Sequence, residues 1–163
     1  MPDRDTGTTG IEAILGDARP RETIVRVCVA GDLAGRLDQL IERRQGLART
    51  SLGGDGAAEV DAEIADVREQ MAGRTHAFTF RALPAKAWSD LLAAHPDPGK
   101  TRAFNVDTFP LALVAACCAD PQMDAGQAGR LFDALNEGAR SLLFDAAWQV
   151  NTGAVPVPFS ASA

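Results

Sequence analysis

The chain lacks the features that mark several large classes of protein. It has three cysteines and two histidines in 163 residues, with no C-x-x-C motif, and His76 and His95 stand apart without metal-ligand spacing. Three cysteines are too few for a disulfide framework, which favours a reducing compartment. The polar N-terminus, MPDRDTGTTG, has no apolar signal region, and no window approaches the roughly 20 apolar residues that cross a bilayer. We therefore expect a cytoplasmic protein with no metal, no cofactor and no membrane partner.

Positive charge is also scarce. The chain carries 16 basic and 22 acidic residues, for a net charge of -6. Binding of nucleic-acid phosphates needs a concentrated basic face, whereas the longest basic feature here is Arg43-Arg44, next to Glu42. We expect no nucleic-acid partner. Apolar residues, at 46%, suffice for one domain or for two small units that share a core.

Catalytic motifs are missing as well. The stretches AGDLAG and LGGDGA contain glycines but neither the Walker lysine nor the G-x-G-x-x-G order, and no serine stands in G-x-S-x-G. The carboxylates fall at expected helix starts and on helix surfaces, and no spacing brings two together as general acid–base catalysis requires. We expect no catalytic residue, so an enzyme is the less favoured interpretation.

Two adjacent cysteines, Cys117 and Cys118, lie in the most apolar stretch of the chain, FNVDTFPLALVAACCADPQM (104–123). Neighbouring residues on a helix point about 100° apart, so the pair cannot easily bind one tetrahedral metal without other ligands. A reactive cysteine needs a base and an electropositive setting, whereas these two have apolar neighbours. The pattern favours two packing residues in a buried helix over a redox or metal site.

The first half predicts a flexible N-terminal arm (1–20) and a strand–αα-hairpin–strand unit (21–83). The segments 22–29 and 75–83 have the β-branched or alternating composition of strands, and Gly73 ends the helix before the second one. Two apolar stripes at helical spacing lie between them, with Asp32 as the N-cap of the first; they comprise Leu33, Leu37, Leu40, Ile41 and Leu47, then Val60, Ile64, Val67 and Met71. We expect helices of about 20–25 Å joined by a glycine-rich loop, and strands that pair at their base.

The second half predicts a helical unit (84–152) with a small bundle of about four helices, followed by an extended C-terminal tail (153–163). The expected helix starts are Pro84, Asp107, Asp124 and the turn 136–138. The helix from Asp107 should run to about Ala119 and stop at Asp120-Pro121. The fold class is therefore α+β, mainly α-helical, with two strands.

Most aromatic residues lie in this second half. Aromatic side chains fill helical cores by default, but a helical unit with surplus apolar residues can also offer a groove to an amphipathic partner helix. The candidate partner-binding residues are Trp88, Phe104, Phe109, Phe132 and Trp148.

Three stretches carry a resemblance to a known family: FRALPAKAWSDLLAAHP (80–96), FNVDTFPLALVAACCADPQM (104–123) and LFDALNEGARSLLFDAAWQVN (131–151). In their order along the chain and in their local sequence they resemble the tail assembly chaperones of long-tailed, non-contractile (siphovirus-type) phages and prophages of high-GC actinobacteria. The similarity covers roughly residues 22–163, including the strand–hairpin–strand unit and the tail VPVPFSASA. It rests on segment order, not on a catalytic signature.

The resemblance implies a non-enzymatic role in virion morphogenesis. Proteins of this kind bind the long helical tape measure protein, keep it soluble while tail tube subunits polymerise around it, and are absent from the mature virion. Many also exist in a longer, frameshifted form that recruits the tail tube protein, and this chain would be the short form. The resemblance places the protein in the host cytoplasm.

Two other interpretations stay open at this point. One is a structural head–tail connector or tail terminator component, which would be present in purified particles. The other is a small cytoplasmic enzyme or regulator, which would need a pocket with convergent polar groups. The sequence also leaves open self-association and whether the strands pair within one chain or between chains.

Overall fold

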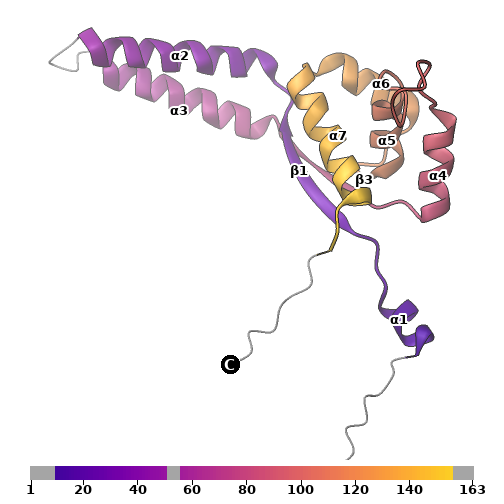
Figure 1. Ribbon diagram of the computed structural model, residues 1–163. Helices are drawn as coiled ribbons and strands as arrows, with labels where there is room; N and C mark the ends of the chain where they lie inside the picture. Colours follow the sequence, from indigo (N-terminus) through magenta and orange to yellow (C-terminus); the bar gives the residue numbers. More distant parts are fainter. Residues whose placement is uncertain (1–9, 51–55, 156–163) are drawn as a thin grey trace, which may run out of the picture.

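Antiparallel pairing of two strands lies at the centre of the computed structural model, which describes residues 10–50 and 56–155 (Figure 1). The described elements, in chain order, are α1 (Ile11–Asp17), β1 (Glu22–Cys28), α2 (Gly31–Thr50), α3 (Ala57–Gly73), β2 (Thr75–Arg81), α4 (Ala85–Ala94), α5 (Phe109–Cys117), β3 (Cys118–Asp120), α6 (Ala125–Ala134) and α7 (Glu137–Thr152). The expected class, α+β and mainly α-helical, is confirmed.

The sheet has three strands in the order β1-β2-β3. β1 pairs with β2 within the chain, from Glu22 opposite Arg81 to Cys28 opposite Thr75. The expectation of only two strands was wrong: α5 ends at Cys117, and the next three residues turn extended and pair antiparallel with β2, with Cys118 opposite Phe80. β3 gives the second edge of β2 hydrogen-bonding partners that it would otherwise lack.

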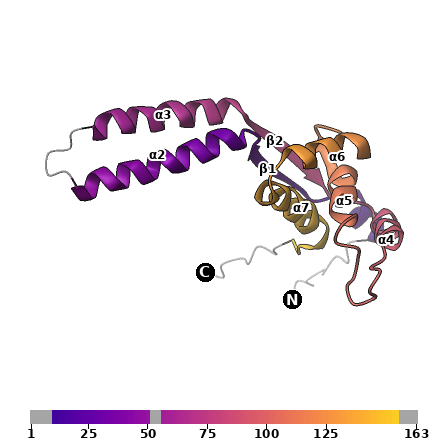
Figure 2. The ribbon, with the colours of Figure 1, turned by 90° about the horizontal axis from the view of Figure 1, so that it is seen from above.

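The helical hairpin, formed by α2 and α3, projects from the rest of the molecule as a narrow extension (Figures 1 and 2). Its seam confirms both apolar stripes: Leu40, Val60, Ile64 and Val67 are buried, and the other stripe residues pack against them. At 20 and 17 residues the helices are about 30 and 25 Å long, so α2 exceeds the expected length. Asp32 lies inside the first turn of α2, not at its cap, because the helix already begins at Gly31.

The body, formed by β1–β3 and α4–α7, has one core that joins residues from both halves of the chain. α7 packs on β1 and β2, α5 packs on β2, and α4 and α6 pack on α5. The buried residues of this core are Val27, Phe78, Phe80, Phe109, Leu113, Val114, Cys117, Cys118, Leu135, Leu143, Ala147 and Val150. The sheet therefore provides one wall of the core, α5 and α7 pack directly on it, and α4 and α6 pack on α5.

Most helix boundaries in the body follow their expected signals. Asp124 caps α6 through a reciprocal capping box with Gln127, and α7 ends at Thr152 before Gly153. Pro84 stands one residue before α4. Asp107 does not cap α5: its own N–H donates to Asn105 Oδ1 at 2.9 Å, which holds it in the preceding turn and leaves Thr108 at the cap position.

The segment that was expected to be a flexible N-terminal arm contains a two-turn helix, α1. Its three large apolar side chains, Ile11, Ile14 and Leu15, are all more than half exposed. Of the C-terminal tail, residues 153–155 are described, and Ala154 O accepts a hydrogen bond from Arg21 Nη1 at 3.4 Å. The expected loop within 51–55 and the remainder of the arm and tail (1–9, 156–163) lie outside the described residues.

Candidate partner-binding site

The two adjacent cysteines are packing residues. Cys117 is the last residue of α5 and Cys118 the first of β3, and both are buried. Burial raises the pKa of the Cys117 thiol, and burial raises that of Cys118 to about 11, so neither forms a thiolate near neutral pH. Within residues 10–50 and 56–155, no three His, Cys, Asp or Glu side chains group as a metal site would require.

Five aromatic rings form one contiguous aromatic cluster: Trp88, Phe104, Phe109, Phe144 and Trp148. Phe109 is fully buried at its centre; its ring centroid lies 4.4 Å from that of Phe104 and 6.1 Å from that of Trp88. Trp148 stands 5.4 Å from both Trp88 and Phe104. The tilted and edge-on geometries are the favourable ones for aromatic pairs. The cluster therefore ties α4, the 95–108 loop, α5 and α7 together.

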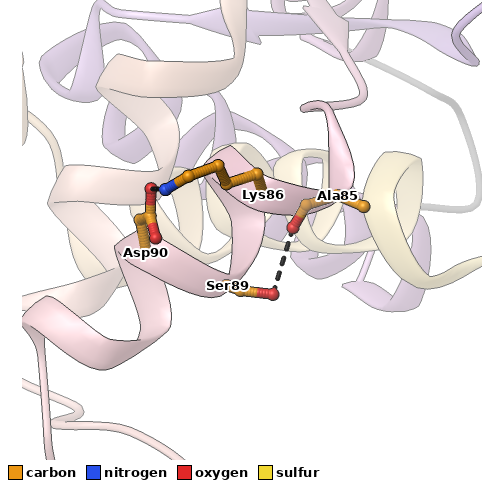
Figure 3. A network of polar contacts seen from close by, with 4 residues as sticks. All are labelled: Ala85, Lys86, Ser89 and Asp90. Carbon is orange, nitrogen blue, oxygen red and sulfur yellow. Dashed lines mark hydrogen bonds and ion pairs between the residues drawn. The ribbon is translucent and has the colours of Figure 1, made fainter.

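Helix α4 is amphipathic, with a polar face toward solvent and Trp88 on the side that faces the core. Figure 3 shows this face, on which Lys86 Nζ and Asp90 Oδ2 form an ion pair at 2.6 Å and Ser89 Oγ donates to Ala85 O at 3.1 Å. The opposite side of the helix carries Trp88, Leu91 and Leu92, which pack against the core. An amphipathic helix of this kind buries its apolar stripe and leaves its charges in water.

A groove of about 430 Å³ opens beside the aromatic cluster. We call it the α6–α7 groove, because the end of α6 and the start of α7 form much of its wall. Its apolar lining comes from three separate parts of the chain: Val106, Pro110, Leu111, Phe132 and Phe144. Val106 is 44% exposed, and the other four are half-buried. The groove thus offers accessible apolar surface on the helical layer.

The polar lining of the groove is mainly acidic. Asp107, Asp133 and Glu137 are exposed, and Arg140 contributes the one positive charge. Arg140 Nε lies 3.6 Å from Glu137 Oε2, which is within ion-pair range but too long for a hydrogen bond, so this buried Nε has no hydrogen-bond partner among the described residues. Three carboxylates against one guanidinium give the groove a net negative charge.

The sharp connection between α6 and α7 creates this groove. Only Leu135 and Asn136 separate the two helices. Leu135 is buried in the core, and the Asn136 side chain accepts a hydrogen bond from Ala139 N at 2.9 Å, which starts α7 in its new direction. The capping box at Asp124 fixes the other end of α6. The groove wall is therefore built on capped helices, not on a loose loop.

The loop between α4 and α5 is fixed by side-chain hydrogen bonds. His95 Nδ1 lies 2.9 Å from Thr108 Oγ1, and the Asp97 carboxylate accepts from the backbone N–H groups of Thr101 and Arg102 at 2.9 and 3.0 Å. These backbone donors, Thr101 first, hold the pKa of Asp97 below its ordinary value. The loop carries Phe104 into the aromatic cluster and Val106 to the groove, so its fixed conformation contributes to both.

One positioning residue escaped the sequence analysis. Asn151, near the end of α7, accepts from Leu83 N at 2.8 Å through Oδ1, while its Nδ2 donates to Ala147 O at 2.8 Å and lies 3.1 Å from Cys117 Sγ. It thereby joins the segment between β2 and α4 to α5 and α7. No sequence signal identifies such a contact, because its partners are 68 and 34 residues away.

Two other cavities lie apart from the aromatic residues. One, of about 300 Å³, lies at the base of the helical hairpin near Asp32 and Arg74; the other, of about 420 Å³, lies beside Met123 and Gln127. Of the five candidate residues, Trp88, Phe104, Phe109 and Trp148 meet in the aromatic cluster, and Phe132 lines the α6–α7 groove with Phe144. Phe144, not among the candidates, belongs to both features.

Comparisons with family models, with curated proteins and with solved structures give no match to this chain. None of the described helices has the length and apolar character needed to span a bilayer.

Proposed function

We propose that this protein is a tail assembly chaperone of a siphovirus-type phage or prophage of actinobacteria. In this role it binds the tape measure protein, keeps it soluble and helps to recruit tail tube subunits during tail morphogenesis. It acts without catalysis in the host cytoplasm and is absent from the mature virion. A frameshifted longer form would make the main contact with the tail tube protein.

One observation carries the proposal. The three stretches that resemble the family, residues 80–96, 104–123 and 131–151, meet in the aromatic cluster, and the last two of them also line the α6–α7 groove. A surface that combines accessible apolar side chains with charged ones is the kind that receives an amphipathic helix. A tape measure protein offers many such helices.

The charge of the chain supports the same role. Exposed apolar helices aggregate, and covering them with many copies of a protein of net charge -6 gives a complex whose like charges repel. The chaperone must later be displaced, so a shallow groove that binds weakly and repeatedly along the length suits the task better than one deep site. The α6–α7 groove, with three exposed carboxylates around a half-buried apolar lining, is shallow in this sense.

Coexpression tests the proposal. The full chain, produced together with the tape measure protein of the same phage or prophage, should convert that protein from an insoluble to a soluble form and co-purify with it. Purified phage particles should contain the tape measure protein without this chain. A tape measure protein that stays insoluble and unbound would refute the chaperone role, and the presence of this chain in purified particles would favour a head–tail connector or tail terminator component.

A further inference from the structure

Exposed apolar side chains are distributed unevenly over the molecule. Those that are large and exposed among the described residues are Ile11, Ile14, Leu15, Ile24, Val106, Leu142 and Val155. None of them belongs to the helical hairpin, although α2 and α3 are the longest helices of the described chain. An apolar partner therefore finds its contacts on the body or on α1, and the α6–α7 groove combines one such side chain, Val106, with a cavity.

The walls of the groove favour a helical occupant. Its lining comes from the turn before α5, the first turns of α5, the end of α6 and the first turns of α7. An extended peptide bound there would find no strand edge to satisfy its backbone N–H and C=O groups, whereas a helix satisfies these groups internally. The half-buried Leu111, Phe132 and Phe144 provide the apolar surface that one face of such a helix requires.

The charge of the groove selects among helices. The exposed carboxylates of Asp107, Asp133 and Glu137 attract an apolar stripe flanked by Lys or Arg and repel one flanked by Asp or Glu. The chain's own exposed apolar helix, α1, carries Glu12 and Asp17 and no basic residue, so a second copy's α1 is a poor occupant. The net charge of -6 also speeds the approach of a basic partner.

We propose that the α6–α7 groove is the docking site for a basic amphipathic helix: a segment whose apolar stripe is flanked by Lys or Arg. The apolar stripe packs on Val106, Leu111 and Phe132, and the flanking basic groups pair with Asp133 and Glu137. The inference deepens the proposed function and rests on it for the identification of the partner as a segment of the tape measure protein.

Binding of designed peptides to the full chain tests the groove itself. The probes are two fluorescein-labelled 18-residue amphipathic helices, one of Leu and Lys and one of Leu and Glu. Fluorescence anisotropy measures their binding. The Leu/Lys peptide should bind, and the Leu/Glu peptide should not. The double variant Asp133→Lys/Glu137→Lys should lower the Leu/Lys affinity by about tenfold or more.

The matched control reverses two exposed charges on α3, Asp66→Lys/Glu69→Lys, and so changes the net charge by the same amount. It should lower the affinity by less than about twofold. Val106→Ser, at a position 44% exposed, should leave the fold intact and weaken binding by about threefold or more through lost apolar area. Equal losses in the groove and control variants, or no loss in either groove variant, would overturn the proposal.

Co-purification with the tape measure protein separates this inference from the proposed function. If the native chain and both groove variants retain the tape measure protein equally, the groove proposal is wrong and the chaperone role stands. If the native chain binds the Leu/Lys peptide in the groove but not the tape measure protein, the chaperone role is wrong and the docking site stands. Loss of the tape measure protein in the groove variants alone supports both.

Discussion

In the helical hairpin, four buried residues form a single seam between two helices, whereas in the body twelve buried residues from the sheet and the helices converge on one core. The exposed surfaces differ in the same way. The hairpin is covered by charges, including the ion pair of Arg44 with Asp61 at 2.8 Å, and the body presents an apolar groove. The hairpin is therefore a polar projection, and the docking surface that we propose lies on the body.

The largest expected effect is in the body core. Phe80 is fully buried in β2, between β1 and β3, and Phe80→Ala should cost about 3–5 kcal/mol because the structure closes only part of the cavity. Urea denaturation measures the loss. Ile24→Ala on the neighbouring strand, where the side chain is 61% exposed, is the control and should cost under about 1 kcal/mol. Equal losses would contradict the position assigned to the core.

A substitution in the hairpin seam should have a smaller and more local effect. Leu40→Ala should cost about 2 kcal/mol, at the lower end for leucine, because the seam is one layer deep and can collapse. Hydrogen exchange should quicken in α2 and α3 and stay unchanged in the body. The exposed neighbour Gln39→Ala should alter neither region. Faster exchange throughout the body after Leu40→Ala would show that the two cores unfold as one.

Asn151 tests the polar contacts of the body. Asn151→Ala leaves Leu83 N without its acceptor and should cost about 1–3 kcal/mol in chemical denaturation. The control, Gln149→Ala, changes an exposed residue of the same helix and should cost under about 0.5 kcal/mol. An Asn151→Ala variant as stable as the native chain would mean that water replaces the amide and that the contact does not contribute to stability.

The cysteine pair should affect stability a little and binding not at all. Cys117→Ala and Cys118→Ala should each cost on the order of 1 kcal/mol by removing a buried sulfur. Because burial raises both pKa values, a thiol reagent at pH 8 should modify the half-buried Cys28 first and the other two only after unfolding. Loss of tape measure binding in a folded double variant would return the pair to the list of functional residues.

The smallest effect concerns the loop that carries Phe104 and Val106. The folded pKa of Asp97 lies below its ordinary value of 3.8, so its carboxylate stabilises the loop above that pH, and this contribution is lost as the pH falls through the lowered value. Asp97→Asn should lower the melting temperature slightly at pH 7 and make no difference at the lowest pH at which the protein stays folded. A difference that grows on acidification would have the wrong sign.

The comparison between hairpin and body also separates what the sequence predicts from what it does not. The seam was predictable because Val60, Ile64 and Val67 recur at helical spacing and contact residues close in the chain. The end of α3 at Gly73 and the start of α6 at Asp124 were predictable for the same reason, because each depends on residues close in the chain. β3 was not predictable, because three residues at the end of an apolar helix have no strand pattern of their own and become a strand only through pairing with β2.

The candidate site divides along the same line. That the aromatic residues meet was a reasonable expectation, but the assignment of Phe109 to the buried centre and of Phe132 to the groove depends on how α6 turns into α7. Asp107 looked like a helix cap and lies instead at the groove, since Asn105 holds its N–H. The groove unites residues 106 to 144, and such a long-range arrangement leaves no local signal.

Hydrogen exchange of the free protein and of the complex that we propose with the tape measure protein tests the central claim most directly. Complex formation should slow exchange in the segments that line the α6–α7 groove, residues 106–111 and 132–144, and leave α2 and α3 of the hairpin unchanged. Protection confined to the hairpin, with the groove segments unaffected, would contradict the account.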